Sequence, residues 1–255
     1  MLRLDRQPWR EVRAAGERGA IALLPVGSQE QHAAHLPMGT DTLLAEAVVD
    51  AALARLAPAG GDPELVRLPA LPFGHSPHHL FAAAVSLSAA TLQAVLADVL
   101  DSLVRSGFRR VLLVNGHGGN DEIVRLAVKR CALERDVALG ACSYWALGDG
   151  GSPGHAGRFE TSLMLAAHPD LVAPVPPWRA PAEPPLFHRP PAPGLLVERH
   201  GEWERVGGTT DDARAADAET GRELFDARVE ALAGAIRAFA AATDRSHGGG
   251  TREDH

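Results

Sequence analysis

The chain has few of the residues on which several common kinds of chemistry depend. Lys129 is the only lysine among 25 basic residues, and no GxxxxGK[ST] sequence surrounds it, which argues against P-loop nucleotide binding and Schiff-base catalysis. The two cysteines, Cys131 and Cys142, lack the spacing of a metal-binding pair. Their arrangement favours a reducing compartment and no disulfide. No apolar run is long enough to span a membrane, and the N-terminus lacks a signal-peptide core. We expect a cytoplasmic protein.

An excess of cationic side chains is also missing. The formal net charge is -7 and the isoelectric point is near 5.9. Binding to nucleic acid or to an anionic membrane surface depends on clustered cationic side chains. The composition therefore predicts neither of these partners, and small molecules, peptides and proteins remain.

The size and composition fit one large globular domain. The chain has 255 residues, of which 45% are hydrophobic, so it can bury a sizeable core. We expect a single domain over residues 1–245 and a disordered polar tail over 246–255. Residues 174–193 contain nine of the nineteen prolines, too many for a helix or a central strand. This segment should be extended and should lie over the domain or reach a neighbouring subunit.

Apolar runs of strand length alternate with helical patterns along most of the chain. Ser88 is placed to cap the most regular helix, which ends near Gly107, and Thr40 or Asp41 is placed to cap another that begins near Thr42. This alternation predicts right-handed crossovers and a parallel sheet, and hence an α/β fold. The expected strands are 20–26, 65–71, 109–112 and 137–145, and the expected helices are 42–56, 89–106, 121–135, 159–167 and 212–241.

A glycine-rich loop with one histidine follows the third expected strand. Its sequence, NGHGGN over residues 115–120, precedes a helical pattern that starts near Asp121. Such a loop places His117 at the carboxyl end of a strand, where open α/β sheets bind their ligands. Taken alone, the three glycines are equally consistent with a tight turn.

Three further stretches carry side chains of the kinds that bind metals. Because parallel strands end at the same edge of the sheet, all of these residues can meet there. A mixture of imidazole and carboxylate suits zinc or manganese, whereas carboxylates alone favour magnesium or calcium. These candidates are Glu30 and His32 after the first strand, Asp41 at the next helix start, His117, and His155 with Glu160 after the fourth strand.

Each candidate also has an ordinary explanation. Asp41 could serve only as a helix cap, and Glu30 could lie on a loop surface. His35, His75, His78 and His79 are more typical of exposed loops or of a pocket lining than of a metal site. Ser152 lies in a literal GxSxG sequence, but Pro153 follows it and has no N–H for the oxyanion hole of a serine hydrolase.

Three motifs together resemble the creatininase family of metal-dependent amidohydrolases. They are PVGSQEQH over 25–32 with HLP over 35–37 and Thr40-Asp41, then NGHGGN over 115–120, then HAGRFETS over 155–162. The resemblance runs from about residue 20 to residue 170. It implies a three-layer α/β/α fold with a mostly parallel sheet, hydrolysis of amide C–N bonds, and a homo-oligomer with a hexamer as the candidate size.

The resemblance also implies two divalent ions per chain, with zinc expected first and manganese or iron as alternatives. Glu30, His32, Asp41 and His117 match metal ligands, Asp41 as the bridging one, and His155 matches a residue that shuttles a proton. These positions leave the second ion short of ligands. Glu160 is our candidate to complete it, and the competing interpretation is that Glu160 only orients His155.

Two departures from the family bear on the substrate. Creatinine-hydrolysing members have a glutamate where this chain has Gly119, and the short loop between Trp145 and His155 has no second tryptophan to close over a small ring. Creatinine is therefore disfavoured. Other activities in the family are deformylation of a purine-biosynthesis-like intermediate and peptide trimming of the mycofactocin type, and the compact loop fits peptide trimming better. Substrate contacts are expected from His75, His78, Trp145, Gly118 and Gly119. A non-catalytic ligand-binding protein and a metal-assisted isomerase or lyase stay as alternatives.

Overall fold

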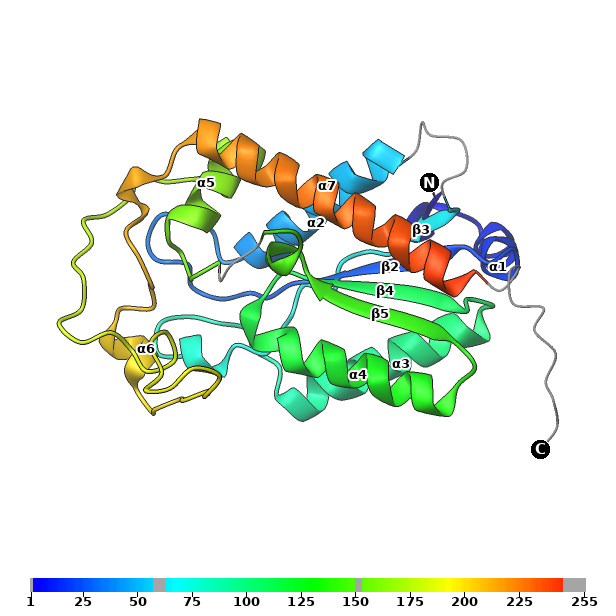
Figure 1. Ribbon diagram of the computed structural model, residues 1–255, viewed down its shortest axis with the longest axis horizontal. Coiled ribbons are helices and arrows are strands. Elements are labelled where there is room, and N and C mark those ends of the chain that lie inside the picture. Colours follow the sequence, from blue (N-terminus) through cyan, green and yellow to red (C-terminus); the bar gives the residue numbers. More distant parts are fainter. Residues whose placement is uncertain (1, 57–62, 150–152, 245–255) are drawn as a thin grey trace.

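A five-stranded parallel sheet forms the centre of the protein (Figure 1). The structure is a computed structural model and describes residues 2–56, 63–149 and 153–244. The strands lie in the order β1-β3-β2-β4-β5, and every neighbouring pair is parallel. The expected α/β class and parallel sheet are confirmed. The strands are β1 (Leu2–Arg3), β2 (Ile21–Val26), β3 (Leu65–Arg67), β4 (Arg110–Asn115) and β5 (Ala138–Ser143).

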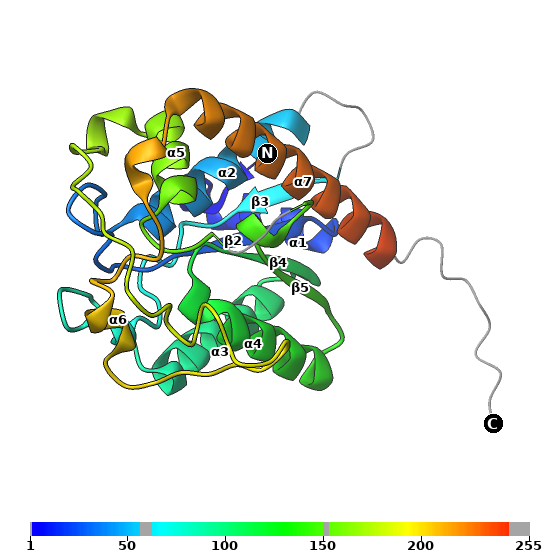
Figure 2. The same ribbon diagram turned by 60° about the vertical axis from the view of Figure 1, so that its left-hand side comes forward.

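Helices cover both faces of this sheet and make the three layers (Figures 1 and 2). One buried apolar cluster joins the sheet to α2 (Thr40–Leu56), α5 (Arg158–Ala167) and α7 (Ala218–Thr243). A second cluster joins the opposite face to α1 (Trp9–Glu17), α3 (Ala89–Arg105) and α4 (Asp121–Glu134). The short helix α6 (Glu202–Arg205) lies away from the layers, beyond the carboxyl ends of the strands (Figure 1).

The register of the strands determines where the loops meet. Val26 at the end of β2 pairs with Asn115 at the end of β4, and Asn115 pairs with Ser143 at the end of β5. The three loops that follow these strands therefore start at the same level of the sheet.

Several expected boundaries differ from the observed ones. The prediction that Thr40 or Asp41 caps a helix starting near Thr42 is wrong, because α2 begins at Thr40 and Asp41 lies in its first turn. The strand expected over 65–71 stops at Arg67, since Pro69 has no N–H to donate. The last helix starts at Ala218, where the Asp217 side chain accepts from the Thr220 N–H. The predicted Ser88 cap of α3 is confirmed, with Ser88 accepting from the Thr91 N–H.

The proline-rich segment 174–193 contains no helix or strand. Two parts of the expected organisation, the tail 246–255 and Ser152 of the GxSxG sequence, lie outside the described residues. Among the described helices, none combines the length and apolar character needed to cross a membrane.

Candidate metal centre

The loops after β2 and β4 and the start of α2 converge at one edge of the sheet. Asn115 shapes the β4 loop, because its carboxamide donates to the His117 carbonyl at 2.7 Å and accepts from the His117 N–H at 3.1 Å. Gly116 lets this loop approach α2, since a Cβ there would lie 2.4 Å from the Asp41 carbonyl oxygen. His117 thereby reaches the side chain of Asp41.

Four groups of ligand atoms lie close together at this edge, and two of them share Asp41. In the Glu30 cluster, formed by Glu30, Asp41 and His117, the His117 Nδ1 atom lies 3.2 Å from Asp41 Oδ2 and the Nε2 atom lies 3.3 Å from Glu30 Oε2. In the His32 cluster, formed by His32, Asp41 and Glu160, the His32 Nε2 atom lies 3.2 Å from Asp41 Oδ1 and 3.9 Å from Glu160 Oε2. Asp41 belongs to both clusters and offers one carboxylate oxygen to each.

Each of the two imidazoles has one nitrogen that donates to a backbone carbonyl, and in His117 this is the Nε2 atom that also lies near Glu30. His32 Nδ1 donates to the Glu30 carbonyl at 3.1 Å, and His117 Nε2 donates to the His75 carbonyl at 3.1 Å. Metal-binding histidines are commonly oriented in this way, because a donor on one nitrogen leaves a lone pair on the other. His32 Nε2 and Asp41 Oδ2 are buried and have no hydrogen-bond partner. The donor set therefore fits one or two divalent cations of the zinc or manganese kind.

The electrostatics of the centre favour bound positive charge. Burial raises the pKa of Asp41, but His32 and His117 outweigh it and bring the pKa down to about 2. Burial lowers the pKa of His32, but the surrounding carboxylates, Asp41 foremost, raise it to about 10. The ionised carboxylates of Glu30 and Asp41 thus favour positive charge at this place, and a divalent ion would take the place of the protons on the two imidazoles.

Glu160 faces the His32 cluster. Its Oε2 atom accepts from the Ala156 N–H at 2.6 Å, and burial raises the pKa of its carboxyl to about 8 despite the opposing effect of His32. The His155 ring is held elsewhere, since its Nε2 atom lies 2.7 Å from the Gln31 carbonyl and its backbone N–H donates to Thr210 Oγ1. This geometry favours the prediction of Glu160 as a ligand over its role as an orienter of His155.

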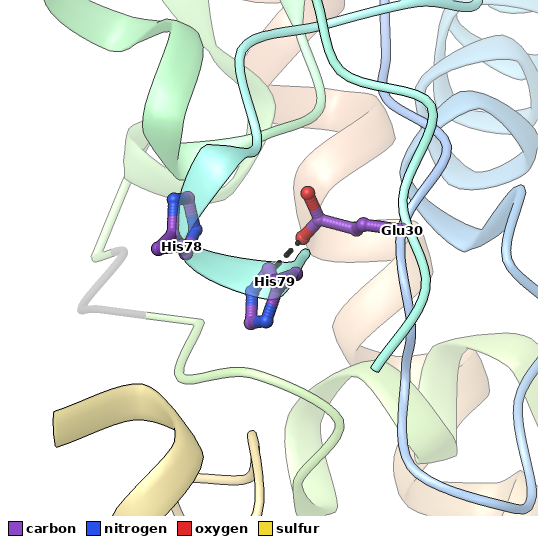
Figure 3. Close-up of side chains that lie close together, drawn as sticks. All are labelled: Glu30, His78 and His79. Atoms are coloured by element: carbon purple, nitrogen blue, oxygen red, sulfur yellow. Dashed lines mark ion pairs between the residues drawn. The ribbon is translucent and has the colours of Figure 1, made fainter. Parts of the chain in front are cut away.

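Two histidines expected on a loop surface or in a pocket lining belong to the buried interior. His79 is fully buried, and its Nε2 atom lies 3.4 Å from Glu30 Oε1 (Figure 3). His35 is also buried and pairs with Thr161 Oγ1 at 2.8 Å. The exposed-loop interpretation of these two is wrong, and the pocket-lining interpretation is confirmed, because both residues are buried and each lines a cavity. Their sequence positions carry no periodicity that could have revealed this.

A cavity of about 830 Å³ opens onto the clusters and contains several of the expected substrate contacts. His78, Trp145, Gly118 and Gly119 line it, together with Asp41, His117, His155 and Glu160. The predicted contact His75 is not among its lining residues, and the His75 ring is instead bonded to the Leu87 carbonyl at 2.9 Å.

Sequence reasoning missed the aromatic side of this cavity. The strap, residues 183–210, carries Phe187 and Trp203 into the lining. The Trp203 ring centroid lies 4.9 Å from that of His79 and 5.9 Å from that of His155. The loop between Trp145 and His155 has no second tryptophan, as expected, and Trp203 reaches the site from a segment distant in sequence. Phe187 among the prolines was a signal for this side of the cavity.

Gly119 cannot be replaced by a residue with a side chain in this arrangement. A Cβ at this position would lie 2.3 Å from the His75 carbonyl oxygen and 2.6 Å from His117 Nε2. The ring of His78 occupies the adjacent space, with its Cε1 atom 3.2 Å from the same Cβ position. The site has no room for a glutamate there.

The comparisons with known proteins agree with this architecture. The family model Creatininase, described as creatinine amidohydrolase, matches residues 5–236. A creatinine amidohydrolase from Pseudomonas putida is 32% identical, over 90% of this chain and 94% of that protein. A mycofactocin precursor peptide peptidase from Mycobacterium tuberculosis (strain ATCC 25618 / H37Rv) is 36% identical, over 82% of this chain and 81% of that protein. A solved creatininase variant of the Zn-Zn type superposes with a TM-score of 0.72 at 31% identity, covering 92% of this chain and 97% of that one.

Proposed function

The chain belongs to the creatininase family of metal-dependent amidohydrolases, and from this premise we propose that it hydrolyses the C–N bond of a peptide or other extended amide with two divalent ions. The observation that carries this proposal is the pair of ligand clusters that share Asp41. One cluster alone would suit a single-ion site, whereas a shared carboxylate between two clusters is the arrangement of a dinuclear one.

In this proposal each cluster holds one ion. Glu30 and His117 bind the first, His32 and Glu160 bind the second, and Asp41 bridges the two. Zinc is the expected metal, with manganese or iron as alternatives, because the donors are imidazole and carboxylate. Such ions would lower the pKa of water and polarise the amide carbonyl. The related creatininases of the Zn-Zn type and with Mn both support a divalent ion of this kind.

His155 has the role of proton carrier. An amine is a poor leaving group until it is protonated, so amide hydrolysis needs a group that accepts a proton and then returns it. His155 lines the cavity, and its Nδ1 atom lies 3.5 Å from Glu30 Oε1. Burial lowers the pKa of His155 well below its usual value, so the ring is neutral before the reaction.

The shape of the cavity supports a substrate larger than creatinine. A volume of about 830 Å³ lies within the range of pockets that hold drug-sized ligands, about 300 to 1,000 Å³. Gly119 leaves the loop without the glutamate expected of creatinine hydrolysis, and the similarity to a mycofactocin precursor peptide peptidase points to peptides. The proposed substrate contacts are His78, Trp145 and the Gly118–Gly119 backbone. His75 is not proposed as a substrate contact, because it does not line the cavity.

Metal analysis combined with a hydrolysis assay tests the proposal. Purified protein should contain close to two divalent ions per chain and should cleave members of a peptide library faster than creatinine. Prolonged chelation should abolish cleavage, and zinc or manganese should restore it. Full activity with only trace metal would contradict the proposed metal centre. Faster cleavage of creatinine than of any peptide would contradict the proposed substrate class.

A further inference from the structure

Gln31 lies between two candidate ligands, Glu30 and His32, but its side chain points into a different network. It is buried, and its carboxamide contacts the backbone of Ala33, the carbonyl of Gly208 in the strap, and the rings of His79 and His155. A single side chain thus touches both histidines that flank Glu30 and also the strap that closes the cavity.

The orientation of this carboxamide follows from its backbone partners. The Oε1 atom lies 2.9 Å from the Ala33 N–H, which can only donate, so Oε1 is the acceptor. The Nε2 atom lies 2.9 Å from the Gly208 carbonyl, which can only accept. Gly208 is fixed at this contact, since a Cβ there would lie 2.2 Å from Gln31 Nε2. Both ends of the carboxamide are therefore assigned by groups whose roles are unambiguous.

The second N–H of the carboxamide sets the tautomer of His79. Gln31 Nε2 lies 2.9 Å from His79 Nδ1, and because Nε2 of the glutamine is a donor, the ring nitrogen must be the bare acceptor. The proton of a neutral His79 is then on its Nε2 atom, which faces Glu30 Oε1 at 3.4 Å (Figure 3). A nitrogen that carries a proton cannot bind a metal, so His79 supports Glu30 and is not an additional ligand.

The backbone of the same glutamine sets the tautomer of His155. The His155 Nε2 atom lies 2.7 Å from the Gln31 carbonyl oxygen, which can only accept, so this nitrogen must donate. The 3.1 Å contact between His155 Nε2 and Gln31 Nε2 then joins two donors and is not a hydrogen bond. The Nδ1 atom of a neutral His155 is then bare, and it faces Glu30 Oε1 and the ligand atoms of His32. The Nδ1 atom of His155, which can accept a proton, therefore faces the Glu30 and His32 clusters.

We propose that Gln31 is a positioning residue that holds both His79 and His155 in the Nε2–H tautomer, so that the Nδ1 atom of His155 carries the proton during amide hydrolysis. The role of His155 in this statement rests on the proposed function, whereas the two tautomers do not. The side chain of Gln31 acts on His79, and its carbonyl acts on His155.

Nitrogen NMR of the zinc-loaded protein reads the tautomers directly. With ¹⁵N-labelled histidine, and with the two rings assigned through His79→Phe and His155→Phe, both should show a protonated Nε2 and a bare Nδ1. In Gln31→Glu the new carboxylate oxygen can only accept, so Nδ1 of His79 should become protonated. A protonated Nδ1 on either ring of the unmodified protein would overturn the proposal, and so would an unchanged His79 in Gln31→Glu.

Gln29→Glu is the matched control, because it makes the same chemical change two positions away in the same loop. It should leave both tautomers as they are; a change in His79 equal to that of Gln31→Glu would overturn the proposal by showing a general effect of charge. Gln31→Glu keeps the Gln31 carbonyl, so its metal content and the tautomer of His155 should be unchanged. A protonated Nδ1 on His155 in this variant would overturn the assignment of that ring to the carbonyl. If no peptide is cleaved but the tautomers are as stated, the proposed function fails and the assignment by Gln31 holds.

Discussion

The rings of Phe187 and Trp203 stack with centroids 4.0 Å apart and planes 5° from parallel. The pair lies on the strap and forms one side of the cavity that opens onto the Glu30 and His32 clusters. Glu202, which is buried, holds the two parts of the strap together: its carboxylate accepts from the Leu186 N–H at 3.0 Å and pairs with Arg199. One side of the cavity is therefore formed by a segment that contains no candidate metal ligand.

Trp203→Ala should weaken substrate binding and leave the metal centre intact. The indole contributes apolar surface to the cavity but no ligand atom, so we expect KM to rise about tenfold, the effect of losing roughly 1.4 kcal/mol of binding. Two ions per chain should remain. Trp9→Ala, on an exposed position of α1, is the control and should change neither quantity. An unaltered KM for Trp203→Ala would show that the strap does not touch substrate.

Glu202→Ala should loosen the strap. Leu186, Arg199 and Arg205 would lose their shared acceptor, so limited proteolysis should cut within residues 183–205 sooner than in the unmodified protein. KM should rise as in Trp203→Ala. Glu204→Ala, on the exposed side of the same helix, is the matched control. Equal cleavage rates for the two variants would contradict the role of Glu202 in holding the two parts of the strap together.

Asp41→Ala should lose both ions. Its Oδ1 and Oδ2 atoms face different histidines, and without this carboxylate two cations would lie close together with less negative charge between them. Elemental analysis of the purified variant gives the answer. Glu30→Ala, by comparison, should lose one ion, since Glu30 belongs to only one of the two clusters that share Asp41. Two ions retained in Asp41→Ala would reject the bridging role.

Glu160→Ala should change the metal content, whereas His155→Ala should change the rate of turnover. Removing Glu160 takes a carboxylate from the His32 cluster and should cost one ion. Removing His155 should leave metal content unchanged and slow turnover by about 10² to 10⁴ fold, because a proton carrier is lost. Metal content and amide hydrolysis should be measured on the same preparations. Both ions in Glu160→Ala would refute its role as a ligand, and normal turnover in His155→Ala would refute the shuttle.

The protein should form a homo-oligomer, and the family resemblance gives a hexamer as the candidate size. Several large apolar side chains remain exposed on the single chain, including Leu133, Leu195 and Leu196. Leu195 and Leu196 follow directly on the proline-rich segment, and exposed apolar groups of this kind commonly lie in interfaces. Light scattering of the purified protein checks this. A stable monomer would mean that the segment packs only on its own domain.

The sequence by itself determined the parallel sheet and the residue types at its carboxyl edge. Strand-length apolar runs alternating with helices leave few topologies, and in a parallel sheet the loops after β2 and β4 must start on the same side. The sequence alone therefore places Glu30, His32 and His117 at the same edge of the sheet. Asp41 followed because its helix starts directly after the first of these loops.

Only the tertiary structure decided how the site is closed and which atoms face it. Trp203 and Phe187 reach the cavity across an irregular segment whose path has no periodicity and hence leaves no pattern in the sequence. The burial of His79 depends on a single turn, Pro77–His79, packing against Glu30. The tautomers of His79 and His155 depend on contacts of about 3 Å to Gln31, and distances on that scale arise only when segments distant in sequence are brought together by the packed core.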